Sequence, residues 1–112
     1  MNISISNTAY RNLYNIAKFT LQVSANYSNY IIYELYSTID SIKNFPYIGR
    51  YVPEILNTNY RERICKNYRI IYFISQQSNT IYIRYVISVK QNSNLFFKIH
   101  KKELLNFLNT FI

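Results

Sequence analysis

The sequence has one glycine, one cysteine, one histidine and no tryptophan, and only five of its 112 residues are acidic. A single glycine excludes the glycine-rich loops that cradle phosphate groups. A single cysteine excludes an intramolecular disulfide, and Cys65 stands in an apolar run typical of a buried strand. His100 has too few potential ligands around it in the sequence for a metal site, so we expect no metal and no cofactor.

Long apolar runs are also absent. No segment approaches the roughly 20 apolar residues of a membrane-spanning helix, and no cationic leader precedes an apolar run. We therefore expect a cytoplasmic protein without a membrane partner. The scarcity of acidic residues leaves a net charge of +8, which favours an acidic partner such as nucleic acid or an acidic protein segment.

Hydrophobic residues make up 49% of the chain, enough for one folded domain over residues 1–112 and too many for a disordered chain. Their spacing predicts the order strand, helix, helix, three strands, helix. Because the link between the first two helices is short, these helices should form an antiparallel hairpin. We therefore expect an α+β fold in which the hairpin packs on an antiparallel sheet. The expected elements are strands at 1–6, 61–66, 68–75 and 81–88 and helices at about 8–23, 27–44 and 93–110, with 47–59 as a loop.

Two elements carry more specific expectations. In the last strand, alternation predicts that Ile81, Ile83, Tyr85 and Ile87 share one face, while the face with Arg84 is partly open. The last helix has an apolar stripe opposite three lysines. It is expected to dock on the sheet, or alternatively to move, covering a site or waiting for a partner. The stripe consists of Leu95, Phe96, Ile99, Leu104, Leu105, Leu108 and Phe111, and the lysines are Lys98, Lys101 and Lys102.

Arginine is the main candidate for chemistry, because planar guanidinium groups suit phosphate and carboxylate. Arg61 and Arg63 are two residues apart and share one strand face, with Glu62 on the other. Glu54 follows the stiff Pro53. Either Glu54 forms a structural ion pair that ties the loop to the sheet, or it is the base of a phosphate-binding patch. The arginines that could converge on the open sheet face are Arg50, Arg61, Arg63, Arg69 and Arg84.

The central third of the chain contains, in order, Pro46, Gly49-Arg50, Val52-Pro53-Glu54, Arg61-Glu62 and Tyr68-Arg69-Ile70-Ile71-Tyr72. In residue type, order and spacing this pattern resembles the RelE/ParE superfamily, the small toxins of bacterial type II toxin–antitoxin systems. The resemblance is strongest over about residues 44–86. It implies a growth-inhibiting cytoplasmic toxin with a helical hairpin on a sheet, of a kind associated with plasmid stabilisation. It also implies a cognate antitoxin whose segment, often acidic, wraps the toxin.

The superfamily divides by target. RelE-like members cleave mRNA in the ribosomal A site without metal, whereas ParE-like members bind DNA gyrase and trap its cleaved DNA. If this chain is a nuclease, the resemblance makes Arg69 the phosphate-stabilising residue and Glu54 the base, assisted by Arg61 and Lys90. The remaining binding candidates are Arg50, Arg63 and Arg84.

One departure from the family pattern separates these mechanisms. Where many members carry a histidine followed by basic residues, this chain has Ser88-Val89-Lys90-Gln91. Where RelE places a tyrosine, the nearest residues are Phe96 and Phe97. Loss of a general acid or base typically removes about 10²–10⁴ in rate. We therefore favour a ParE-like gyrase inhibitor, which is not an enzyme. The alternatives are a RelE-like, ribosome-dependent and metal-independent endoribonuclease, and an inactive toxin relic.

Overall fold

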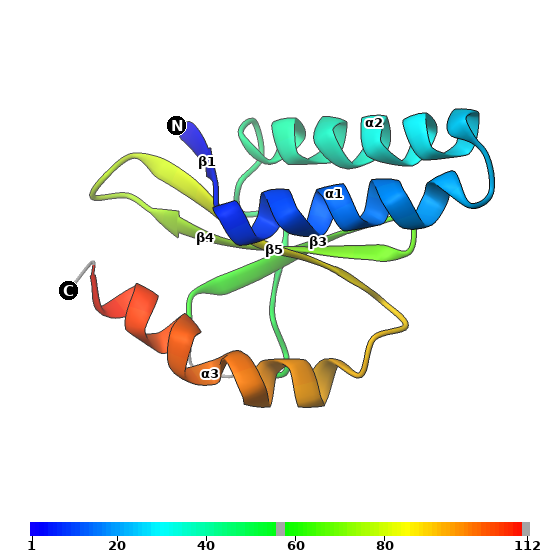
Figure 1. Cartoon of the computed structure of the whole chain (residues 1–112). Helices are drawn as coiled ribbons and strands as arrows, with labels where there is room; N and C mark the ends of the chain where they lie inside the picture. The colour runs from blue at the N-terminus through cyan, green and yellow to red at the C-terminus, as the bar shows by residue number, and fades with distance from the viewer. Residues whose placement is uncertain (56–57, 111–112) are drawn as a thin grey trace.

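The computed structural model describes residues 1–55 and 58–110, which form a five-stranded sheet with a helical hairpin on one face and a third helix on the other (Figure 1). This arrangement confirms the predicted α+β fold. The sheet order is β1-β5-β4-β3-β2, with β1 parallel to β5 and the other pairs antiparallel. The strands are β1 (Asn2–Ile5), β2 (Arg50–Tyr51), β3 (Tyr60–Cys65), β4 (Tyr68–Ser75) and β5 (Thr80–Ser88), and the helices are α1 (Asn7–Leu21), α2 (Ala25–Ile42) and α3 (Ser93–Asn109).

The hairpin forms because each of its helices has an apolar stripe and a serine cap. The Oγ atoms of Ser6 and Ser24 accept hydrogen bonds from backbone N–H groups in the first turns of α1 and α2. Pro46 follows the end of α2, where the chain leaves the hairpin. The loop that was predicted next contains one short strand, β2, which pairs with β3. The buried stripes are Ala9, Leu13 and Ile16 in α1 and Ile31, Leu35, Ile39 and Ile42 in α2.

The sheet separates two apolar cores. Strand β4 contributes to both, with Ile70 and Tyr72 facing the hairpin and Ile71 and Phe73 facing α3. The run from Ile70 to Ile74 is apolar at every position, which is typical of a strand covered on both sides. Both faces of a strand are buried only when each face is covered by another element. Helix α3 covers the sheet face that the sequence predicted to be partly open.

A bulge in β5 makes one prediction wrong. Consecutive residues of β4 pair with Tyr85 and Ile83, so Arg84 is an extra residue in the ladder. The extra residue reverses the alternation. As a result, Ile81 and Ile83 face the hairpin, whereas Tyr85 and Ile87 face α3, and the four do not share one face.

Helix α3 is docked on the sheet. The Tyr60 hydroxyl donates a buried hydrogen bond of 3.0 Å to the carbonyl oxygen of Leu104. Three residues that were expected in the docked stripe, Leu95, Ile99 and Leu105, are exposed, and Phe111 lies outside the described residues. None of the described helices is long and apolar enough to cross a membrane. The buried side chains of α3 are Phe96, Phe97 and Leu104.

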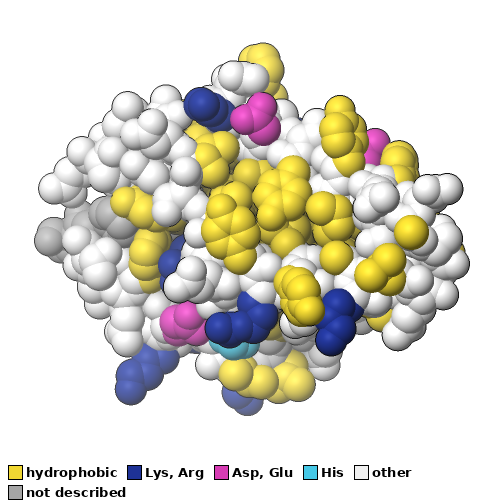
Figure 2. Space-filling model, turned by 45° about the horizontal axis from the view of Figure 1, so that its top comes forward, with side chains coloured by type: hydrophobic (Ala, Val, Ile, Leu, Met, Phe, Trp, Pro, Cys, Tyr) yellow, Lys and Arg dark blue, Asp and Glu magenta, His cyan; other side chains and the backbone are white. Residues whose placement is uncertain are grey.

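The outer face of the hairpin carries many exposed aromatic side chains. Figure 2 shows apolar side chains gathered on the face of the molecule that carries the hairpin. Exposed aromatic residues are therefore common on this protein, and exposure alone does not mark a site. Those on the two helices include Tyr10, Tyr14, Phe19, Tyr30, Tyr33 and Tyr36.

Candidate functional site

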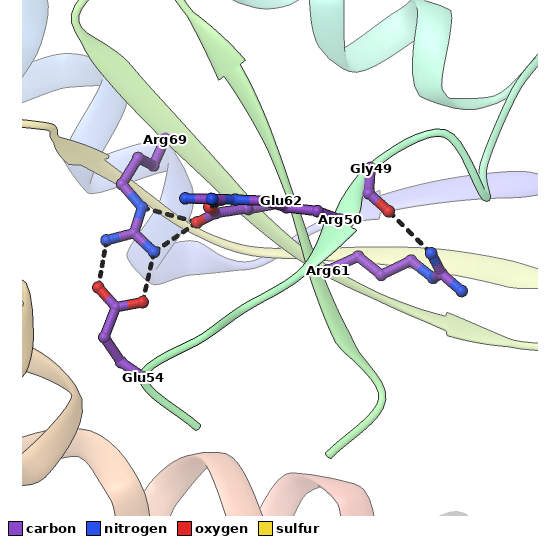
Figure 3. A network of polar contacts seen from close by, with 6 residues as sticks. All are labelled: Gly49, Arg50, Glu54, Arg61, Glu62 and Arg69. Atoms are coloured by element: carbon purple, nitrogen blue, oxygen red, sulfur yellow. Dashed lines mark hydrogen bonds and ion pairs between the residues drawn. The ribbon is translucent and has the colours of Figure 1, made fainter. Parts of the chain in front are cut away.

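Arg69 of β4 lies at the centre of a network of ion pairs between the sheet and the loop before β3 (Figure 3). Its Nη1 and Nη2 atoms donate to the two carboxylate oxygens of Glu54 at 2.7 and 2.8 Å. Its Nε atom donates to Oε2 of Glu62 on β3 at 2.6 Å. Two carboxylates on separate segments therefore share one guanidinium group.

The network continues to the edge of the sheet. Arg50 of β2 lies directly opposite Glu62 in the β2–β3 ladder, and its Nε atom donates to Oε1 of Glu62 at 2.5 Å. The Glu62 side chain is completely buried, while that of Arg50 is 66% exposed. Charges alternate from Glu54 through Arg69 and Glu62 to Arg50, so the four side chains are neutral as a group.

The loop is fixed in place by close packing at Gly49. A Cβ atom at this position would collide with the hydroxyl of Tyr72 and would lie 2.7 Å from the carbonyl oxygen of Glu62. The same Tyr72 hydroxyl donates to the carbonyl oxygen of Pro46 at 2.7 Å. Only glycine leaves room for the chain to pass this close to the sheet, and the approach brings Arg50 next to Glu62.

Arg69 is not available as a phosphate ligand in this arrangement. All three of its nitrogen atoms donate to carboxylates, and its side chain is buried. The ring of Phe97 from α3 lies with its centroid 5.4 Å from the guanidinium carbon. A phosphate could bind Arg69 only after displacing buried carboxylates, which would leave their charges unpaired at a large cost.

Glu54 is a poor general base for the same reason. The hydrogen bonds from Arg69 lower the pKa of Glu54 from its ordinary 4.5 to about 2, against an opposing effect of burial. A general base works best when its pKa lies near the working pH. The geometry thus corresponds to the structural ion pair between loop and sheet that was one of the two interpretations of the sequence.

The lowered pKa makes stability depend on pH. Because the folded-state pKa of Glu54 lies below its ordinary value, the stabilisation is complete above about pH 5 and is lost as the pH falls towards 2. We expect Glu54→Gln to be less stable than the parent by about 3 kcal/mol near neutral pH, with the difference vanishing near about pH 2. Urea unfolding across this range measures the difference. A difference that does not change with pH would contradict the ion pair.

The other candidate residues do not join this network. Arg61 and Arg63 share the hairpin side of β3, as predicted. There, Nη1 of Arg61 donates to the carbonyl oxygens of Tyr47 and Gly49 at 3.2 and 2.7 Å, and Arg63 reaches the Ser41 hydroxyl at 3.5 Å.

Arg84 and Lys90 lie away from both the Arg69 network and the pair Arg61 and Arg63. Arg84 points towards α3, where its guanidinium carbon lies 3.9 Å from the ring centroid of Phe107 and Nη2 lies 3.9 Å from Glu103. Lys90 is exposed in the turn after β5. Arg50 and Arg69 meet at Glu62, but the common patch of five arginines expected from the sequence does not form, because Arg61, Arg63 and Arg84 lie elsewhere.

Glu62 is the member of the ion-pair network whose role the sequence analysis did not recognise. It was placed opposite Arg61 and Arg63 but given no partner. The alternation of side chains along β3 could have revealed its role, because a carboxylate on the same strand face as Tyr60 lies in a core and must be paired there. His100 packs on Phe96 and lies 3.4 Å from Glu103, and no group of three possible metal ligands occurs in the described part of the chain.

One family profile matches the chain, and two solved structures share its fold. The sequence profile described as "ParE toxin of type II toxin-antitoxin system, parDE" matches residues 3–93. No curated protein sequence matches significantly. The chain resembles the structure "Chromosomal ParDE TA system from P. aeruginosa" with a TM-score of 0.67 and 10% identity, over 79% of this chain and 95% of that one. It also resembles the toxin–antitoxin complex RelBE2 from Mycobacterium tuberculosis, with a TM-score of 0.53 and 16% identity, over 78% and 95%.

Proposed function

Because the chain belongs to the ParE toxin family of type II toxin–antitoxin systems, we propose that it inhibits bacterial growth by binding DNA gyrase and trapping its cleaved DNA. In this role the chain is a binding protein that catalyses no reaction of its own. Gyrase acts in the cytoplasm, so we place the action of the toxin there. No metal or cofactor is needed.

The observation that carries this proposal is the closed ion-pair network around Arg69. The residues that resemble the nuclease pair, Arg69 and Glu54, are bound to each other and largely buried. Phe97, near the expected position of a proton-donating tyrosine, packs on Arg69 and has no hydroxyl group. These features favour a toxin whose target is a protein over one that cleaves mRNA.

We further propose that an antitoxin with an acidic segment neutralises the toxin. The two structural neighbours described above come from a ParDE system and from a toxin–antitoxin complex. The net charge of +8 suits an acidic segment of such a partner. A gene for a small acidic protein is therefore expected beside this one, and its absence would count against the pairing.

Short induction of the chain without antitoxin tests the mechanism. We expect growth arrest with trapped gyrase–DNA cleavage complexes and intact mRNA, and co-expression of the neighbouring antitoxin should prevent both effects. New mRNA 5′ ends within translated frames, without trapped gyrase, would establish the RelE-like nuclease instead. Unimpaired growth with neither signal would identify an inactive relic.

A further inference from the structure

A second site lies on the hairpin side of the sheet, near its β2 edge. Tyr47 in the loop and Tyr51 in β2 are 51% and 57% exposed, and both rings lie against Arg61 of β3. The guanidinium carbon of Arg61 is 4.2 Å from the ring centroid of Tyr51 and 5.3 Å from that of Tyr47. We call these three residues the tyrosine ledge.

The ledge borders a pocket of about 290 Å³. Besides the ledge residues, the pocket is lined by two amide side chains, Asn59 and Gln76, and by Ile74. The Nε2 atom of Gln76 donates to the Tyr47 hydroxyl at 2.6 Å, which holds that ring in place. Aromatic faces, amides and a cation thus meet in one recess, and none of its lining residues is acidic.

Arg61 keeps donors available for a ligand. Its Nη1 atom is used by the carbonyl oxygens of Tyr47 and Gly49, the second of which is seen in Figure 3. Its Nε and Nη2 atoms make no hydrogen bond within residues 1–55 and 58–110. In contrast to Arg69, Arg61 is bound only to neutral carbonyl groups, so its positive charge is not cancelled.

We propose that the tyrosine ledge binds single-stranded nucleic acid, with an unpaired base stacked on Tyr51 or Tyr47 and the adjoining phosphate on Arg61. Proteins bind single strands by combining aromatic stacking platforms with cations, and amide side chains hydrogen-bond to base edges. The exposed aromatic faces and the amide side chains beside the cation favour nucleic acid over an acidic protein segment, which would need only the positive charge. The inference goes beyond the proposed function and depends on neither gyrase nor the ribosome.

Fluorescence anisotropy of the full-length chain with labelled oligonucleotides of about 12 nucleotides tests the ledge. We expect Tyr51→Ala to weaken binding about 5- to 100-fold. The slope of log affinity against log salt concentration should stay unchanged, because no charge is removed. Tyr33→Ala is the matched control, since it removes an even more exposed tyrosine from α2 and should leave affinity unchanged.

Tyr51→Trp tests whether the loss in Tyr51→Ala comes from the missing ring or from misfolding. Because this variant keeps a larger aromatic ring at position 51, it should bind oligonucleotides at least as tightly as the parent. A comparison of single-stranded DNA with single-stranded RNA shows which nucleic acid is preferred. Tighter binding of either single strand than of duplex DNA supports single-strand binding at the ledge. Equal affinities of parent, Tyr51→Ala and Tyr33→Ala would overturn it and assign binding to net charge alone. Unchanged oligonucleotide affinity with weaker capture of purified gyrase would also overturn it, and would make the ledge a protein contact. The gyrase proposal is scored separately by the cleavage-complex assay.

Discussion

Arg69→Met is expected to lower the free energy of unfolding by about 3–5 kcal/mol. Methionine is close to arginine in length but leaves the fully buried Glu62 with only its exposed partner Arg50, and leaves Glu54 without a cationic partner among the described residues. Removing one member of a buried ion pair is costly because the other charge stays away from water without compensation. Equilibrium unfolding in urea measures the loss.

Two variants make this test specific. Arg50→Ala removes the other partner of Glu62 from the exposed end of the network and should cost less than about 1 kcal/mol. Combining Arg69→Met with Glu62→Met replaces a buried pair by apolar side chains, so the double variant should be more stable than Arg69→Met alone. Strictly additive losses in this double-mutant cycle would show that the two side chains do not interact.

Phe97→Ala is expected to destabilise the protein by about 3–5 kcal/mol. Phe97 is buried between α3 and the sheet, where its ring packs edge-on against Phe96 and covers Arg69. Truncation removes this apolar contact and leaves a cavity beside the ion-pair network. Thermal unfolding followed by circular dichroism reports the change.

Ile99→Ala is the control for this prediction, since Ile99 lies in the same helix but is exposed. We expect it to change stability by no more than about 0.5 kcal/mol. If Phe97→Ala had an equally small effect, α3 would not be docked in solution. The hydrogen bond from Tyr60 to the Leu104 carbonyl would then also be broken there.

Periodicity was sufficient for most of the fold. The stripes of α1 and α2 repeat at three and four residues, and the run from Ile70 to Ile74 is apolar on both faces, so hairpin and central strand follow from the residues alone. Strand β2 was missed because a strand of two residues is too short to show an alternation of apolar and polar side chains. Only its pairing with β3 defines it. The bulge was missed because Arg84 leaves no local signal, and its position is set by pairing with β4.

The site was predictable in its members and not in its pairing. The sequence singled out Arg69 and Glu54 as candidates, and an ion pair between Glu54 and an arginine was one of the two interpretations. Which arginines converge depends on the sheet face of each strand residue and on the close approach at Gly49. For this reason Arg61 and Arg63 were grouped with residues that lie on the other side of the sheet.

The shared guanidinium of Arg69 also restricts how the gene can diverge. A change at position 54, 62 or 69 alone leaves a charge unpaired, so each single step lowers fitness through folding before any target contact is altered. Descendants of this toxin should therefore keep these three positions together or exchange them together. Position 50 is free to drift, because Arg50 is largely exposed and Glu62 keeps its ion pair with Arg69. Correlated substitution at the three positions among descendants would reflect a requirement of folding, independent of the target that each lineage attacks.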